Sequence, residues 1–576
     1  MAVYRSHRPR RRPIRSLGFL LAGALWIAPS AGFCQAGGAP APADAERWRE
    51  DLRFMASEMP RRHRNLFHTM TRPQFEEAVR RLDRRIPTLA RHQIIVEMAR
   101  IAAMVGDGHT NVAPTRDPKI GFRAYPVRLY LFRDGLFVRA AASEWADVVG
   151  SRVLRIGRAS ADEAYRAVRD LIGRDNEMDA KFFAPHLLVM PEVLHALGLV
   201  DDMEDAPFLL EGPGGRRLVR LAPAGPADLM SPETDASWTP RPGWVDARDA
   251  GGRTPLWLQA PQDAYWFDHL PAENAVYVQY NQVANKKDGE TIEAFASRLF
   301  AFVDSHAVER LVLDLRLNRG GNGELNRPIL LGLIRARTVD RPGRLFTLIG
   351  RSTWSAAQGL VNELEKYTNT VFVGEPSGGK VNSYGDSARI TLPHSGITVR
   401  VSTLWWQGDE RDRRPWTAPQ VAADLTFEDY RAGRDPALEA ALRYRPERSL
   451  AEALREAVLG GDAALASRRL AAWRADPVHA YADDAEAQVN RLGYALLSEG
   501  RLEPAVAVLR LNAQAFPASA NVHDSLGEAY AAAGDREAAI RSYERALEID
   551  PKSASAAEAL RKLRAAAAVP GSPSQR

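Results

Sequence analysis

A pattern that recurs after 34 residues constrains the fold of this chain more than any other feature of its sequence. Its leucine, glycine, alanine and proline positions return in register, at Leu492 and Leu526, Gly500 and Gly534, Ala505 and Ala539, and Pro517 and Pro551. A period of this length, with a turn glycine between two apolar-periodic segments, predicts two antiparallel helices per unit. The C-terminal part of the chain is therefore expected to be all-helical and built by stacking.

The repeat is similar to the tetratricopeptide repeat (TPR), whose units stack to share a hydrophobic core. Residues 447–490 are rich in helix formers and can supply one degenerate further unit, so we expect a helical repeat region over 447–565. Such arrays commonly present a concave surface, and we expect this one to bind a protein or peptide partner.

The N-terminal segment is typical of a secretory signal peptide. Arginines precede an apolar run of 17 residues, and small residues follow it. We expect a signal peptide over 1–36 and a secreted or periplasmic protein, with a retained membrane anchor as the alternative. Cys34 is the only cysteine, and Phe33 before it disfavours lipidation. The arginines of this segment are Arg5, Arg8, Arg10, Arg11, Arg12 and Arg15.

Removal of this leader would change the formal net charge from +5 to about −1, because residues 1–36 hold six arginines and no acidic residue. A role in nucleic-acid binding loses its main support with that change. No other run is long and apolar enough to predict a membrane span.

Two structured regions and a linker follow the leader. Residues 45–118 show apolar spacings of three and four, which predict an N-terminal helical cap with a capping box at Thr71 and Gln74. Residues 120–225 are β-rich, with a hairpin turn at Arg133-Asp134-Gly135, and predict a small PDZ-like module. Residues 226–256 are rich in proline and glycine and predict a linker.

Residues 255–445 alternate predicted strands with predicted helices from residue 273 onwards. This alternation favours a largely parallel sheet covered on both faces. Sites in such folds gather at the carboxyl ends of the strands. Three polar stretches, "NRGG", "STWS" and "EPSGGK", fall at that edge.

Ser355 begins a predicted helix directly after a predicted strand. A serine hydroxyl attacks a carbonyl only if a base takes its proton and donors stabilise the oxyanion. The backbone N–H of Ala356 is a free helix N-terminal donor, and Gly320 and Gly321 let a backbone N–H approach a substrate closely. The alternative is that Ser355 is only a helix N-cap.

Two residues could act as the base. Lys380 follows Ser355 by 25 residues in a glycine-rich turn, and a lysine needs a lowered pKa for this role. His109, in "GDGHT", needs no such change. Either residue could instead be structural, as a solvated turn lysine or a histidine bonded to a carbonyl. The other histidines do not form a tight ligand cluster, so no metal is expected.

The stretches "LVLDLRLNRGG", "STWSAAQ" and "VFVGEPSGGK" together resemble the S41 family of serine peptidases, the carboxy-terminal processing or tail-specific proteases. "GDGHT" also resembles a motif of that family, and the resemblance covers roughly residues 50–445. It implies a multidomain α/β protein with a crotonase/ClpP-like α/β core.

The resemblance also implies roles for particular residues. Ser355 would be the nucleophile, Lys380 the general base, and the amides of Ala356 and of Gly320 or Gly321 the oxyanion hole. Some members pair the lysine with a glutamine four residues on, where this chain has Tyr384. In the tricorn-like branch a histidine pairs with the serine, which His109 would match, and an acidic residue orients the site.

Glu410 or Asp409 lies in about the right region for such an orienting acid. The sequence thus predicts a secreted serine endopeptidase that cleaves polypeptides through an acyl-enzyme on Ser355, without a cofactor. The alternative is a catalytically inactive S41-like scaffold that binds peptides or proteins and recognises a partner through its TPR region.

Overall fold

The computed structural model describes residues 41–227, 238–287, 289–306, 308–445, 449–482 and 484–565 of the 576-residue chain. The predicted signal peptide over 1–36, with Cys34, lies outside these residues. Within them, no helix is both long and apolar enough to cross a membrane.

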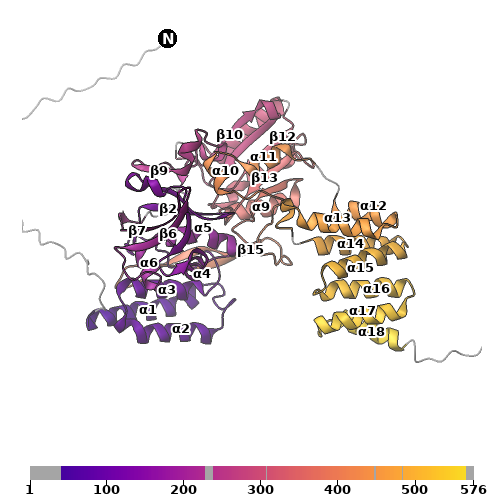
Figure 1. Cartoon of the computed structure of the whole chain (residues 1–576), viewed down its shortest axis with the longest axis horizontal. Helices are drawn as coiled ribbons and strands as arrows, with labels where there is room; N and C mark the ends of the chain where they lie inside the picture. Colours follow the sequence, from indigo (N-terminus) through magenta and orange to yellow (C-terminus); the bar gives the residue numbers. More distant parts are fainter. Residues whose placement is uncertain are drawn as a thin grey trace, which may run out of the picture.

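A six-stranded sheet forms the centre of the α/β region (Figure 1). Its first strand is antiparallel to the second, and every later pair is parallel. In spatial order the strands are β10 (Tyr265–Leu270), β11 (Ala275–Tyr280), β12 (Arg310–Asp314), β13 (Leu345–Ile349), β14 (Val371–Gly374) and β17 (Val421–Ala422).

Helices cover both faces of this sheet. Leu311 and Leu313 of β12 pack with α7 (Ile292–Ser305), α8 (Arg327–Arg335) and α9 (Ala356–Tyr367). Val312, between them, packs on the opposite side with α11 (Pro436–Arg443). Side chains of a strand alternate between faces, so a strand that is apolar on both belongs in a two-sided core. The mixed α/β fold predicted from the sequence is confirmed.

A second sheet, wholly antiparallel, lies in the region predicted to be β-rich. Phe132 pairs with Gly135, so the predicted hairpin turn is present. The strands are β2 (Val127–Phe132), β3 (Gly135–Ala142), β4 (Arg152–Ile156), β5 (Ala159–Ser160), β6 (Ala206–Gly212), β7 (Gly215–Leu221) and β9 (Trp244–Asp246). Strand β9 falls inside the stretch expected to be a linker, where it pairs with β3.

Six helices accompany this sheet: α1 (Pro42–Arg62), α2 (Arg72–Arg85), α3 (Arg91–Ala103), α4 (Ala161–Arg169), α5 (Glu177–Leu187) and α6 (Pro191–Ala196). The capping box of α2 is present, because Thr71 and Gln74 exchange hydrogen bonds. Strands β1 (Arg123–Ala124) and β8 (Gly225–Pro226) form a short separate pair.

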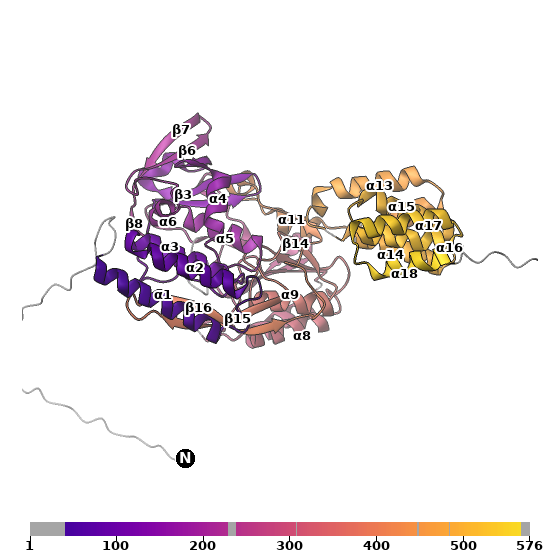
Figure 2. The ribbon, with the colours of Figure 1, turned by 90° about the horizontal axis from the view of Figure 1, so that it is seen from below.

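A long hairpin extends from the region of the parallel sheet to the N-terminal helices. It consists of β15 (Asn382–Thr391) and β16 (Thr398–Gln407). Val399 and Val401 of β16 are buried in the same hydrophobic core as helices α1 to α3 and the antiparallel sheet. Figure 2 shows α1 beside β15 and β16. The helical and β-rich segments therefore share one core, to which the chain returns after Ser355.

The C-terminal part is a stack of helical pairs that stands beside the rest of the molecule (Figures 1 and 2). Gly500 and Gly534 adopt φ values of 74° and 82°, which suit the turn between paired helices. The helices are α12 (Leu450–Leu459), α13 (Ala463–Ala475), α14 (Ala485–Ser498), α15 (Leu502–Ala515), α16 (Ala520–Ala532), α17 (Arg536–Ile549) and α18 (Ala554–Ala565). Tyr481 joins the stack to the core by donating to Asp424 at 2.8 Å.

Candidate active site

The loops that follow β12 and β13 converge at the carboxyl edge of the parallel sheet. The loop after β12 carries Gly320, and the loop after β13 leads through Trp354 to Ser355 at the start of α9. Trp354 N–H donates to the carbonyl of Asn318 at 3.1 Å, which fastens the two loops together. Such an edge is where α/β folds present reactive groups.

Ser355 occupies a strained backbone position. Its φ and ψ are 54° and −123°, and its hydroxyl makes no capping bond to the helix that it precedes. A non-glycine residue at positive φ is uncommon, and such strain gathers at functional sites. Ser355 stands at the N-cap position, but its side chain does not act as a cap. The hydroxyl instead faces His109.

His109 reaches Ser355 from the loop that follows α3, 246 residues earlier in the chain. Its Nε2 lies 3.2 Å from Ser355 Oγ. The loop is shaped by Asp107, whose Oδ1 accepts hydrogen bonds from the backbone N–H groups of His109 and Thr110. The other oxygen of Asp107 bonds the ring of His63 at 2.9 Å, which anchors the loop to the end of α1.

The His109 ring is packed rather than hydrogen-bonded on its other side. It stacks on Trp354 with ring centroids 3.9 Å apart and an interplanar angle of 20°. Within the described part of the chain, His109 Nδ1 is buried and has no hydrogen-bond partner. Burial lowers the pKa of His109 to about 4, and the Asp107 carboxylate opposes this shift. The imidazole is therefore neutral at physiological pH.

Asp175 fixes both Trp354 and the histidine loop. Its Oδ2 accepts a hydrogen bond of 2.8 Å from Trp354 Nε1, and its Oδ1 accepts one of 3.1 Å from the backbone N–H of Gly108. Burial raises the pKa of Asp175 to about 6, so the group is mainly charged at neutral pH. Neither Asp175 nor Trp354 was a predicted site residue. For Trp354 the sequence signal was its place directly before the serine, whereas Asp175 lies in no recognisable motif.

Of the three backbone N–H groups predicted as oxyanion donors, one is already hydrogen-bonded within the protein and two are not. Gly320 N–H donates to Asn318 Oδ1 at 2.9 Å and is thus already engaged. Gly321 pairs with Val283 in a parallel bridge that uses the carbonyl of Gly320 and the N–H of Asn322, so its own N–H points away from Val283. The Ala356 N–H, at the first position of α9, has no partner within the described chain. Gly321 and Ala356 are the available donors.

The neighbours of Gly320 leave no room for a side chain at this position. Its φ is 100°, and a Cβ added there would lie 2.8 Å from Ala356 N and 2.9 Å from Ser355 Cβ. A side chain would displace the nucleophile or the amide beside it.

The other predicted residues lie differently. Lys380 is half-buried, and the structure contains no hydrogen bond or ion pair from its amine to another described residue. Its charge nevertheless acts on Asp175. Tyr384 accepts a hydrogen bond of 3.3 Å from Asn65 and packs against His68. Glu410 is exposed, and Asp409 accepts a hydrogen bond from the backbone N–H of Arg411. Neither carboxylate is hydrogen-bonded to the ring of His109, whose Nδ1 has no partner among the described residues.

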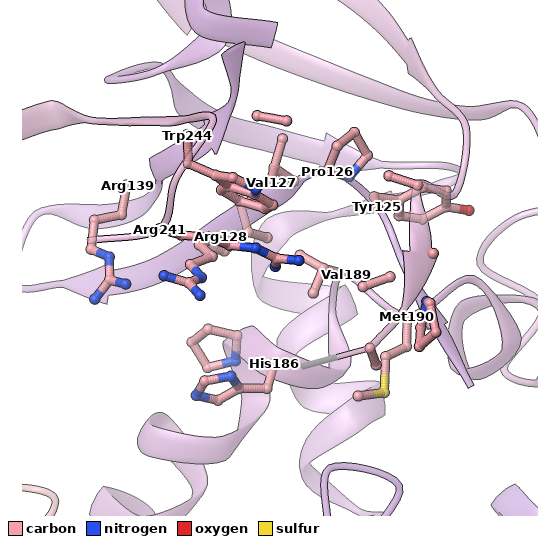
Figure 3. A pocket seen from close by; sticks show the side chains of 18 of the residues that line it. Tyr125, Pro126, Val127, Arg128, Arg139, His186, Val189, Met190, Arg241 and Trp244 are labelled. Atoms are coloured by element: carbon pink, nitrogen blue, oxygen red, sulfur yellow. The ribbon is translucent and has the colours of Figure 1, made fainter. Parts of the chain in front are cut away.

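A cavity of about 540 Å³ lies elsewhere, between β2 and α5 (Figure 3). Figure 3 shows Arg128, Arg139 and Arg241 on one side of it and His186 on the other. Neither His109 nor Ser355 lines this cavity. The paired serine and histidine therefore lie outside it.

Comparisons with known proteins found one family match and several similar solved structures. A family model described as tetratricopeptide repeat matches residues 520–553. No curated protein matches the chain. Similar solved structures include mature CPAF in complex with lactacystin, with 12% identity, a TM-score of 0.47 and coverage of 69% of this chain and 97% of that one.

Two further similar structures are proteases. The photosystem II D1 C-terminal processing protease has 15% identity and a TM-score of 0.31, and the match covers 70% of this chain and 97% of that one. A putative S41 protease from Bacteroides fragilis has 14% identity and a TM-score of 0.27, with coverage of 56% and 82%. The structural neighbours thus include S41 and processing proteases, the group that the sequence resembles.

Proposed function

We propose that the chain is a serine peptidase in which Ser355 is the nucleophile and His109 its general base. The observation that carries this proposal is the 3.2 Å separation between His109 Nε2 and Ser355 Oγ, at a serine held in a strained backbone conformation. A nucleophile within hydrogen-bond reach of a base is the arrangement that acyl transfer requires.

The chemistry follows from these two groups. Neutral His109 takes the Ser355 proton on Nε2 while Oγ bonds to the carbonyl carbon of the scissile peptide. The protonated imidazole then gives that proton to the leaving amine, the C–N bond breaks, and an ester to Ser355 remains. His109 next removes a proton from water, the resulting hydroxide adds to the ester, and Ser355 leaves with the proton returned.

The amides of Ala356 and Gly321 are the proposed oxyanion hole. Both N–H groups lack partners within the described chain; Ala356 directly follows the nucleophile, and Gly321 directly follows Gly320, which lies against Ser355 and Ala356. Gly321 is exposed, as a residue that contacts a bound substrate has to be. Each such donor typically contributes about 3 kcal/mol of transition-state stabilisation.

Of the two candidate bases, the geometry favours His109. Lys380 would need a hydrogen bond to Ser355 to act directly, and the only described side chain that bonds the Ser355 hydroxyl is His109. The role of Lys380 that fits the structure is electrostatic, through the charge that it places near Asp175. The orienting acid of the tricorn-like branch is replaced by packing against Trp354.

An inactive scaffold is the second candidate, and one observation favours it. No acceptor bonds His109 Nδ1 within the described residues, so the imidazolium formed during catalysis would be poorly stabilised. A fluorophosphonate probe separates the two functions. Labelling of wild type that disappears in Ser355→Ala supports the peptidase, whereas absence of both labelling and casein cleavage supports the scaffold.

Two further proposals follow from the sequence. The leader suits export, so we expect the enzyme to act on polypeptides outside the cytoplasm. The helical pairs from α12 to α17 suit a protein or peptide partner, as TPR arrays do. Mass spectrometry of the exported chain, for the position of its new N-terminus, tests the first proposal.

A further inference from the structure

Three consecutive large apolar side chains are exposed near the end of β16. Leu404, Trp405 and Trp406 have 47%, 39% and 57% of their surfaces accessible. Single exposed apolar residues are ordinary, but two large ones on the same face of a strand indicate a surface that binds something. Their position relative to Ser355 and His109 indicates what such a pair of side chains binds.

The two faces of the β15–β16 hairpin differ. Trp405 lies opposite Tyr384, with ring centroids 4.5 Å apart, and Tyr384 in turn packs against His68 in the segment after α1. Leu404 lies opposite Gly385. Since side chains alternate along a strand, Leu404 and Trp406 project from the face opposite to Trp405.

Leu404 and Trp406 project on the side where His109 lies. A Cβ built on Gly385 would be 3.0 Å from Trp406 Cδ1 and 3.7 Å from His109 Cε1. The indole of Trp406 and the imidazole of His109 thus border one space above the bare backbone of Gly385. Because His109 contacts Ser355, this space adjoins the proposed site of acylation.

The Trp406 ring is held in its exposed position. Its Nε1 donates to Asp386 Oδ2 at 2.7 Å, and Asp386, next to Gly385, has a φ of 54°. An exposed indole fixed by a hydrogen bond loses little conformational freedom when a ligand covers it, and aromatic rings of this kind are efficient binding surfaces.

The geometry points to Leu404 and Trp406 as a subsite that binds a bulky apolar side chain of the polypeptide substrate, above Gly385 and next to the scissile bond. This inference rests on the proposed peptidase function, because the occupant is the chain that His109 and Ser355 cleave. It names the preferred substrate as polypeptides with an aliphatic or aromatic residue close to the cleaved bond.

The test uses the full-length protein and pairs of internally quenched peptides that differ at one position, leucine or phenylalanine against serine. Trp406→Ala and Leu404→Ala should lower kcat/KM for the apolar peptide by about tenfold or more, mainly through KM, and should reduce the preference over serine. Trp405→Ala is the matched control. It removes a neighbouring exposed indole from the other face and should leave the preference as in wild type.

Gly385→Ala is a second variant that does not depend on truncating a large residue. Its added methyl would narrow the space beside Trp406, so selectivity should shift from phenylalanine towards smaller side chains. Wild-type preference that persists in Trp406→Ala, Leu404→Ala and Gly385→Ala, with Ser355 still labelled by fluorophosphonate, would overturn the subsite alone. A wild-type chain that neither labels nor cleaves would overturn the peptidase and the subsite together.

Discussion

The imidazole of His109 lies flat against the indole of Trp354, and the N–H of that indole is bonded to Asp175 at 2.8 Å. The histidine is thereby oriented by a stacked ring whose own position is fixed by a carboxylate. This arrangement differs from one in which a carboxylate accepts a hydrogen bond from Nδ1 directly.

Replacement of Trp354 by phenylalanine tests this orientation. The variant keeps an aromatic ring beside His109 but loses the N–H that bonds Asp175. We expect kcat to fall by about tenfold to a hundredfold, because small misplacements of a catalytic group are costly, while KM changes little. A parallel fall in melting temperature without a selective loss of kcat would indicate that Trp354 is only structural.

The identity of the base is tested by two substitutions. His109→Asn should lower kcat/KM by about a thousandfold or more, since removal of a triad base has effects of that order. Lys380→Ala should lower it by less than about tenfold, because the amine acts only through its charge. Steady-state kinetics on one peptide gives both values, and the reverse order would identify Lys380 as the base.

The pH dependence of the reaction follows from the buried histidine. Burial lowers the pKa of His109 to about 4, so the neutral base is present above that pH and is lost as the pH falls through it. We expect kcat/KM to rise between about pH 3 and pH 5 and to form a plateau through neutrality. A limb between pH 8 and pH 10 would instead indicate a lysine base.

Gly320 and Gly323 offer a matched pair for the loop after β12. A Cβ at Gly320 would lie 2.9 Å from Ser355 Cβ, whereas one at Gly323 would lie 3.8 Å from Ala356 Cβ, an ordinary contact. Gly320→Ala should therefore abolish fluorophosphonate labelling, and Gly323→Ala should label as wild type does. Circular dichroism checks that both variants are folded, and equal labelling would contradict the steric role of Gly320.

The buried carboxyl of Asp179, in α5, should make the stability of the protein depend on pH. Burial raises its pKa to about 7 from an ordinary 3.8, and the Arg319 guanidinium, 3.7 Å away, opposes this shift. The folded state thus binds the proton more tightly than the unfolded state. The stability that this group contributes falls as the pH rises from about 4 to 7.

Asp179→Asn should consequently raise the melting temperature relative to wild type more at pH 8 than at pH 5, by at least about 3 °C. Asp268→Asn, at an exposed position of β10, serves as the control and should show no such difference. An equal effect of Asp179→Asn at both pH values would show that the carboxyl titrates normally.

Periodicity predicted much of the fold. Each of three predicted local features is present in the structure: the helical repeat with turns at Gly500 and Gly534, the hairpin at residues 133–135 and the capping box of α2. Each is encoded by residues within one short stretch or one repeat unit. The mixed α/β fold was predicted by the alternation of strand and helix patterns. The shared core of the helical and β-rich segments was not predicted, because its contacts join residues hundreds of positions apart.

The candidate site remains a prediction, and the sequence could name only part of it. Ser355 and His109 were both candidates. Sequence spacing could not show whether His109 or Lys380 is the general base, because the position of His109 depends on the pairing of its loop with β16, far along the chain. Asp175 was not foreseen, because a carboxylate that bonds an indole has no characteristic spacing. The engagement of the Gly320 amide by Asn318 likewise depends on a side-chain rotamer.

The return of β16 to the N-terminal core has a consequence for biosynthesis. The loop that carries His109 is bonded to Arg400 through Asn111, and the core beneath it contains Val399 and Val401. A nascent chain emerges N-terminus first. It cannot complete this core until about residue 401 has left the ribosome. Histidine and serine would then come together only after nearly the whole α/β region exists, so unfinished chains would be unable to cut their neighbours.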